Sequence, residues 1–138
     1  MKIEDWTQLL TDANYVQRIY SKPPDVSKIS IHEVVLDRDA STLKLRFNVF
    51  DYPDKPPAKW VANQFNCVQF TLHVLEVSMV QIFGWSHEVI GPLSISKVET
   101  GVYLLFSNGK EKIECVGAFV VLDKIAGYRG ESRGPAPS

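Results

Sequence analysis

Apolar and polar residues alternate along several short segments of the chain, which is the pattern of β-strands with one buried face. The clearest segment is 43–49, in which four apolar side chains alternate with Lys44, Arg46 and Asn48. A second strand is predicted over 29–36, before a polar turn at 37–42. On one face of this strand we expect Ile29, Ile31 and Val35, and on the other His32, Val34 and Leu36.

The longest apolar run, 59–85, holds two further alternations, over 67–74 and 79–83. Glu76-Val77-Ser78 interrupts the pattern between them. We therefore expect a β-ribbon that folds back near this tripeptide and lies at the centre of a sheet. A buried helix is the alternative for a short apolar run, but the many β-branched and aromatic residues favour strands.

The second half of the chain continues with short strands and turns. A loop is predicted over 87–92 and a strand over 93–98. Segments 102–106 and 112–115 are predicted to pair across Asn108-Gly109, a dipeptide typical of a type I′ hairpin turn. The last strand is predicted over 118–125, with Gly117 as a candidate bulge.

Two segments have different patterns. Residues 4–20 carry apolar residues at helical spacing, with a possible break at 12–14, and Pro23-Pro24 must end the helix. Residues 50–60, FDYPDKPPAKW, have three prolines within five positions, which predicts an extended connection rather than a central strand.

Together these elements predict an α+β, mainly β fold: an antiparallel meander of seven or eight strands, shaped as a half-open barrel or a sandwich, after one N-terminal helical segment. The chain length suits a single globular domain, which we place at 1–128. The small and polar residues of 129–138 predict a disordered tail.

Composition and charge narrow the function. Fifteen basic and sixteen acidic side chains leave a formal charge of −1, which argues against a general binder of nucleic acid or anionic membranes. The N-terminus lacks a signal-peptide core, and no apolar run reaches the roughly 20 residues of a membrane span. Cys67 and Cys115 lie in strand patterns without a C-x-x-C motif, so we expect reduced thiols in a cytoplasmic protein and no metal site.

Chemical motifs give no active site. The chain has three histidines, His32, His73 and His87, but no G-x-S-x-G motif and no phosphate-binding glycine loop. We predict no catalytic residue and no cofactor. One alternative stays open, a small β-barrel that binds a small ligand or acts as an enzyme, with inward-facing His32, His73, Glu33 or Asp51 converging in a pocket.

Several motifs occur together in an unusual order: Trp6, HEVVLDRD, FDYPDKPPAKW, CVQFTLHVLEV and VQIFGW. In this combination, which spans roughly Trp6 to Tyr128, the chain resembles the bacterial immunity protein 50 family. The resemblance implies a small protein encoded beside a polymorphic toxin, which binds its cognate toxin domain and blocks it. It carries over no catalytic residue and does not identify the toxin or the oligomeric state.

A partner-binding site is predicted on the proline-rich segment from Asp51 to Trp60, because prolines limit the freedom lost on binding and aromatic residues offer large contact area. Two alternatives stay open: Trp60 plugs the end of the core, or the partner binds the polar strand face of Lys44 and Arg46. The predicted site residues are Asp51, Tyr52, Asp54, Lys55, Lys59 and Trp60, with Trp85 as a neighbour.

Overall fold

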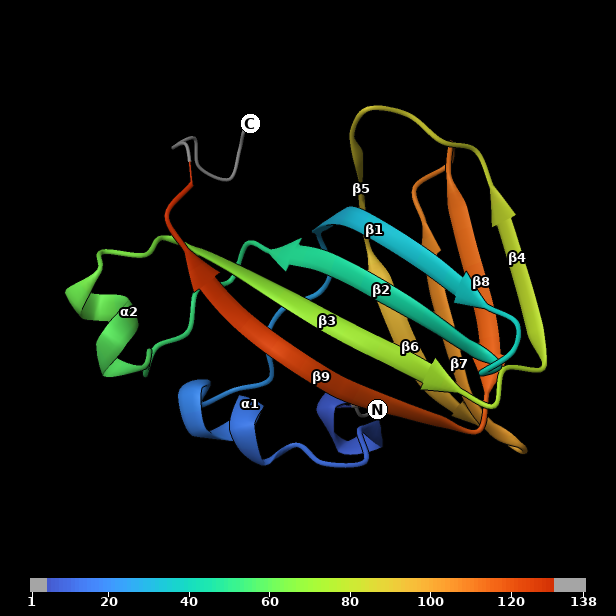
Figure 1. The fold of residues 1–138 in the computed structure, drawn as a ribbon, viewed down its shortest axis with the longest axis horizontal. Coiled ribbons are helices and arrows are strands. Elements are labelled where there is room, and N and C mark those ends of the chain that lie inside the picture. The colour runs from blue at the N-terminus through green and yellow to red at the C-terminus, as the bar shows by residue number, and fades with distance from the viewer. Residues whose placement is uncertain (1–4, 131–138) are drawn as a thin grey trace.

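The computed structural model describes residues 5–130, which form two antiparallel sheets and a few short helices. Figure 1 shows the sheets as two layers whose strands cross at a steep angle. The first sheet has the order β5 (Val89–Gly91), β1 (Ile29–Asp37), β2 (Thr42–Val49), β3 (Cys67–Leu75) and β9 (Phe119–Tyr128). The second has the order β4 (Met79–Phe83), β8 (Lys112–Gly117), β7 (Gly101–Ser107) and β6 (Leu93–Val98). The mainly β fold class predicted from the sequence is confirmed, with the sheets arranged as a sandwich.

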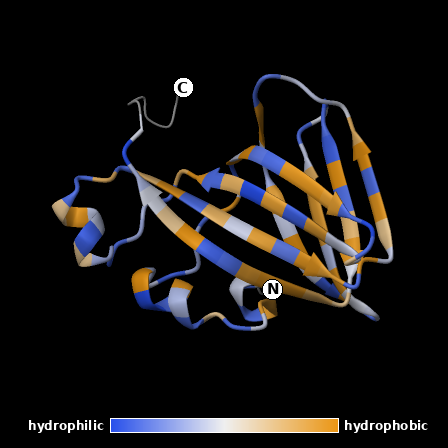
Figure 2. Cartoon of the chain, in the orientation of Figure 1, coloured by the Kyte–Doolittle hydropathy of each residue, from blue (hydrophilic) through white to orange (hydrophobic). Residues whose placement is uncertain are grey.

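The core lies between the two sheets, and strand alternation fills it. On β2 every second residue is buried, and its inward-facing Leu43, Leu45 and Phe47 are fully inaccessible. Leu104 and Phe106 of β7 are equally inaccessible in the second sheet. The strands accordingly appear striped in Figure 2, apolar and polar by turns. Burial of whole aliphatic and aromatic side chains supplies most of the stabilisation, at about 1.5–3 kcal/mol for each.

Two long strands bend from one sheet into the other at a shared corner. β3 continues into β4, and β8 continues into β9, as strands do in orthogonally packed sheets. The corner is held by backbone bonds from Ala118 to the Leu75 carbonyl, 2.9 Å, and from Ser78 to the Val116 carbonyl, 2.8 Å. Gly117 is required there, because a Cβ atom would lie 2.5 Å from Cγ1 of Val74.

This corner shows that the predicted β-ribbon is wrong. β3 is central, as expected, but it pairs with β2 and β9, whereas β4 pairs with β8 at the edge of the other sheet. Residues 76–78 therefore turn the chain into a second layer instead of reversing it. The alternation resumes after the interruption in either case, so periodicity could not distinguish a reversal from a bend.

The N-terminal segment forms two short helices, η1 (Trp6–Leu9) and α1 (Asn14–Ile19), with the break near 12–14 that the sequence allowed. The side chain of Trp6 donates to the Pro24 carbonyl, 2.9 Å, and its ring packs in the core. The chain between the helices covers the edge of β9, where the Thr11 amide donates to the Val120 carbonyl, 3.0 Å. Residue 4 of the predicted helix lies outside the described residues.

Other local predictions also need correction. Residues 5–130 hold nine strands rather than seven or eight, because β5 lies within the predicted 87–92 loop. A bulge between Ile31 and Glu33 shifts the register of β1, which puts Val34 opposite Leu45 on the inner face and Val35 on the outer face. The sequence carries no sign of this bulge.

Turn chemistry differs from the prediction at the β7–β8 connection. Gly109 has a positive φ of 91°, whereas Asn108 does not, so the turn is not type I′. Instead, Oδ1 of Asn108 accepts from the amides of Lys110 and Glu111, at 2.9 and 2.7 Å. Of the predicted tail, 131–138 lies outside the described residues, and the Gly130 amide donates to Asn66 Oδ1 at 2.9 Å.

Candidate partner-binding surface

The proline-rich segment lies at the end of the sandwich and contains a helix that the sequence analysis missed, α2 (Ala58–Ala62). Pro57 immediately precedes it, and prolines are common at helix N-termini because their missing amide has no helical partner to lose. The prediction of an extended connection is therefore correct only before α2. The signal available in the sequence was the run AKWVA after the last proline.

Polar groups of the segment bind it to the N-terminal region. The Asp51 carboxylate accepts from the Asp25 amide at 2.8 Å, and the Tyr20 hydroxyl donates to the Asp51 carbonyl at 2.6 Å. Burial raises the pKa of Tyr20, which keeps this hydroxyl protonated as a donor. Further along, the Lys55 amide donates to the Ile19 carbonyl at 2.9 Å. The connection is irregular, yet it is fixed against α1 and the irregular stretch that leads from α1 to β1.

Asp54 and Tyr52 complete this bracing. The Asp54 carboxylate accepts from the amide and hydroxyl of Ser21, at 2.8 and 2.5 Å, and these bonds lower the pKa of Asp54. The Tyr52 hydroxyl donates to the Phe65 carbonyl at 2.9 Å, and its ring lies 6.2 Å from that of Trp60. The side chains predicted to bind a partner thus hold the segment in shape.

Trp60 belongs to the core, because only 6% of its surface is exposed. Its indole lies on Gly127 of β9, where a Cβ atom would come within 2.5 Å of Cδ2. A glycine at this position is what lets the ring approach the sheet. Trp60 therefore lies where the alternative interpretation placed it, closing the end of the core.

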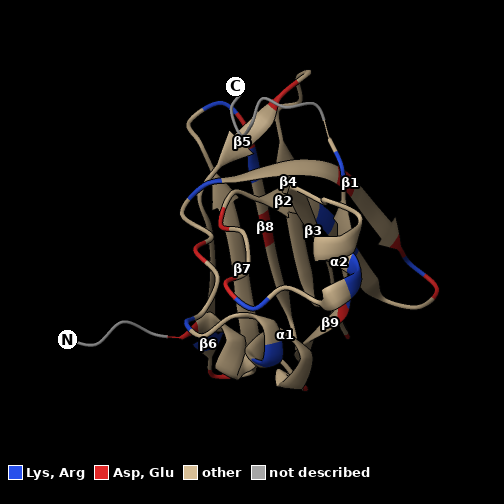
Figure 3. Ribbon diagram, turned by 90° about the vertical axis from the view of Figure 1, so that its left-hand side faces the viewer, with Lys and Arg blue, Asp and Glu red and all other residues tan. Residues whose placement is uncertain are grey.

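Exposed side chains of the segment include Tyr52, Lys55, Lys59 and, from the far side of α2, Val61. Asp54 is also exposed, but its carboxylate is bonded to Ser21. Val61 is 62% exposed and Tyr52 is 37% exposed. Sequence analysis did not single out Val61, because an extended chain gives no reason to place it opposite Trp60. Lys59, the lysine of α2, is exposed, and Figure 3 shows α2 with basic sequence in blue on its ribbon.

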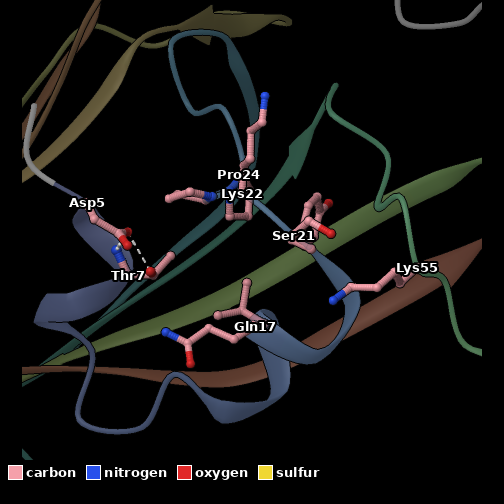
Figure 4. A pocket seen from close by; sticks show the side chains of 10 residues that line it. Asp5, Thr7, Gln17, Ser21, Lys22, Pro24 and Lys55 are labelled. Atoms are coloured by element: carbon pink, nitrogen blue, oxygen red, sulfur yellow. Dashed lines mark hydrogen bonds between the residues drawn. The ribbon is translucent and has the colours of Figure 1, made fainter.

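An open depression of about 430 Å³ adjoins the segment, between α1 and Lys55 (Figure 4). Asp5 lines this depression, and its carboxylate accepts hydrogen bonds from the Thr7 amide and hydroxyl, at 3.0 and 2.5 Å. The ammonium groups of Lys22 and Lys55 form no ion pair with any residue of 5–130. The depression is lined by Asp5, Thr7, Val16, Gln17, Tyr20, Ser21, Lys22, Pro23, Pro24 and Lys55.

Trp85 lies elsewhere. It follows β4 in the connection to β5, at the opposite end of the molecule from α2 in Figure 1. Its side chain is 60% exposed, and the preceding Phe83 is 70% exposed. The structure therefore brings together the predicted residues of 51–60 but does not bring Trp85 to them.

The polar face of the first sheet is a connected network. Arg46 donates to Glu33 at 3.0 Å and to Gln69 at 3.2 Å, and Gln69 donates to Asn48 at 3.0 Å, which in turn donates to Tyr128. The bond from Arg46, followed by that from Lys44, lowers the pKa of Glu33. These groups satisfy one another, which leaves few free donors or acceptors for a partner.

The residues of the enzymatic alternative do not converge. Glu33 pairs with Arg46 on the outer face of the first sheet, Asp51 caps the amide of Asp25, and His73 lies 3.5 Å from Asp123. Burial raises the pKa of Cys115 to about 11, the opposite of what a nucleophilic thiol needs. Within the described part of the chain, no three His, Cys, Asp or Glu side chains group as metal ligands. No helix of residues 5–130 is long and apolar enough to cross a membrane.

Comparison with known proteins gives one match. The family model described as immunity protein 50 matches residues 12–128, which is most of the chain. Among curated proteins and among solved structures, the chain has no match.

Proposed function

Because the chain belongs to the immunity protein 50 family, we propose that it neutralises a cognate bacterial toxin domain by stoichiometric binding in the cytoplasm. The observation that carries this proposal is the family match over residues 12–128. Binding of this kind needs a stable scaffold and a complementary surface, and it needs no catalysis by the immunity protein itself.

The toxin-binding surface that we propose is the exposed part of the proline-rich segment and α2: Tyr52, Lys55, Lys59 and Val61. The preorganisation of this segment supports the proposal. Side-chain and backbone bonds fix the segment before a partner arrives, so little further ordering accompanies association. Val61 and Tyr52 supply apolar and aromatic contact area at 62% and 37% exposure, and the lysines surround it. Trp60 acts from beneath by supporting α2 and the ring of Tyr52.

The depression beside this surface indicates which kind of toxin side chain would bind there. The one carboxylate in its lining, that of Asp5, is occupied by hydrogen bonds from Thr7, whereas Lys22 and Lys55 form no ion pair within residues 5–130. An acidic side chain of the toxin domain that enters the depression would meet the ammonium group of Lys55, with that of Lys22 at its margin (Figure 4). Complementary charge of this kind accelerates encounter and fixes orientation more than it adds affinity.

Co-expression with the toxin domain encoded in the neighbouring reading frame tests the function. Cells that express that domain should grow only when the protein is present, and calorimetry should give one toxin domain per chain. Failure to restore growth, with both proteins produced, would reject the proposed function.

The proposed surface is tested separately by the variants Lys55→Glu and Lys59→Glu together. Both side chains are exposed, so folding should be unchanged while affinity for the toxin falls by about 1–3 kcal/mol. Lys97→Glu and Lys124→Glu make the same change of charge on other elements and should leave affinity within about 0.5 kcal/mol. Rescue that survives the 55/59 change with full affinity would place the toxin on another surface.

A further inference from the structure

The two sheets have open edges, and all but one are protected. Along β9 the N-terminal chain covers the edge at Val120, and η1 packs against β6. β5 has only three residues. The rest of the β1 edge carries a bulge at Ile31/Glu33 and the charged Glu33 and Asp37. Short strands, charges, bulges and covering segments are the usual means by which proteins prevent strands from pairing between molecules.

β4 has none of these protections. Its sequence, MVQIF, contains no charge and no proline, and its register with β8 is continuous from Met79 to Phe83. β8 lies on one side of it, and no described strand pairs with its other edge, which forms the margin of the molecule in Figure 1. Ile82 and Phe83 are 41% and 70% exposed, and Figure 2 shows the strand as largely apolar. An uncharged apolar edge of this kind favours pairing with another strand.

We propose that β4 pairs antiparallel with β4 of a second copy, across a two-fold axis at Gln81. This pairing sets Met79 opposite Phe83 on the outer face and Val80 opposite Ile82 on the inner face. The polar Gln81 meets its own copy, and the two amides can bond to each other. The strand is thus self-complementary, which is what a two-fold interface requires, and the two four-stranded sheets join into one.

Neighbouring registers are less favourable. A shift by two residues sets Gln81 against Met79 or against Phe83, which opposes an amide to an apolar side chain. A shift by one residue sets inner-facing side chains against outer-facing ones, because faces alternate along a strand. The pattern of the strand therefore specifies one register.

The pairing is limited to the strand itself. Gly84 has a positive φ of 81°, and the Val77 amide donates to the Ser41 carbonyl at 3.0 Å, so neither flank of β4 continues the register. The connection that carries Trp85 is held in place, because Ser86 donates to the buried Glu111 carboxylate at 2.7 Å, and Asn108 donates to the same carboxylate at 2.7 Å.

Sedimentation of the full chain alone, over roughly 1 µM to 1 mM, tests the pairing. We expect a reversible dimer, since a five-residue strand is a small interface. Gln81→Lys and Gln81→Glu each set like charges against each other on the axis, and each should weaken the dimer by about tenfold or more. An equimolar mixture of the two variants should form a mixed dimer within a few-fold of the unsubstituted affinity, because Lys then faces Glu.

Ser94→Lys is the matched control, since Ser94 is exposed on β6 at the other edge of the same sheet. It should leave dimerisation unchanged, and the circular dichroism of every variant should match that of the unsubstituted protein. A chain that stays monomeric throughout, a mixture no better than its parts, or equal effects at positions 81 and 94 would overturn the proposal. So would a monomer in which Gln81→Lys, and not Ser94→Lys, abolishes toxin binding, because β4 would then be the toxin's site.

Discussion

The two ends of the molecule use aromatic residues in opposite ways. At the α2 end Trp60 is 6% exposed and Tyr52 donates its hydroxyl to the backbone, whereas at the β4 end Trp85 and Phe83 are 60% and 70% exposed. Both ends are rigidly held, one by Asp51 and Asp54 and the other by Glu111. The difference lies in which groups remain available to a partner: lysines, one valine and a partly exposed tyrosine at the first end, and well-exposed aromatic rings and an open strand edge at the second.

Composition alone does not mark an interface in this protein. Tryptophan and tyrosine in a proline-rich loop are typical of binding sites, yet here the same residues stabilise the loop. Whether such a residue can contact a partner depends on its exposure and on its internal bonds. Both follow from packing partners that are distant in the sequence. Trp60 contacts Gly127, for example, across 67 positions of the chain.

Substitution of the two tryptophans should give the largest contrast. Trp60→Ala removes a buried indole from the end of the core and should lower the free energy of unfolding by about 3–5 kcal/mol. Trp85→Ala removes an exposed one and should change it by less than about 0.5 kcal/mol. Urea denaturation of both variants measures the two values. Similar values for the two would show that the burial difference does not govern stability at these ends.

Gly127→Ala should have a smaller effect at the α2 end. The added methyl would lie 2.5 Å from Cδ2 of Trp60, so the ring or the strand must shift, at about 1–3 kcal/mol. In a Trp60→Phe background the smaller ring leaves room, and the same substitution should lose much of its effect. Additive effects in this double-mutant cycle would contradict a direct contact between the methyl and the ring.

Much of this fold could be predicted from the sequence because alternation reports burial directly. The strands at 29–36, 43–49 and 93–98 and the break in the N-terminal helix follow from local patterns. Two features could not be predicted from the sequence, the bend at 76–78 and the bulge after Ile31, whereas α2 was missed although the run AKWVA follows the last proline. The bend depends on a remote segment, through the bonds between the β3–β4 corner and Val116 or Ala118.

The candidate surface was less predictable than the fold. The sequence singled out 51–60 and Trp85, but it could not show that Asp51 and Asp54 bind backbone amides or that Trp85 lies at the other end. The amides that donate to these carboxylates, at Asp25 and Ser21, belong to a stretch without regular secondary structure. Side chains in such a stretch have no periodic pattern from which their partners can be inferred.

The smallest expected effect is on the stability of the protein at acid pH. It depends on the carboxylates that hold the two ends of the molecule, Asp54 and Glu111. Bonds from Asn108 and then Ser86 lower the pKa of Glu111, and bonds from Ser21 lower that of Asp54. A folded-state pKa below the unfolded value stabilises the protein above the ordinary pKa, and this stabilisation is lost as pH falls through the folded value. Glu111→Gln and Asp54→Asn should therefore each flatten the loss of stability below about pH 4.5, as measured by urea unfolding at successive pH values.

Salt should leave both contributions largely in place. The main donors that lower the two pKa values, Ser21 for Asp54 and Asn108 and Ser86 for Glu111, are uncharged, so about 0.5 M salt has little charge attraction to screen. Protonation of Glu111 should also loosen the connection that carries Trp85, and the emission of that tryptophan in a Trp6→Phe, Trp60→Phe background reports it. An acid dependence that Glu111→Gln leaves unchanged at either salt concentration would mean that the Ser86–Glu111–Asn108 bonds hold the β4 end without contributing to its stability.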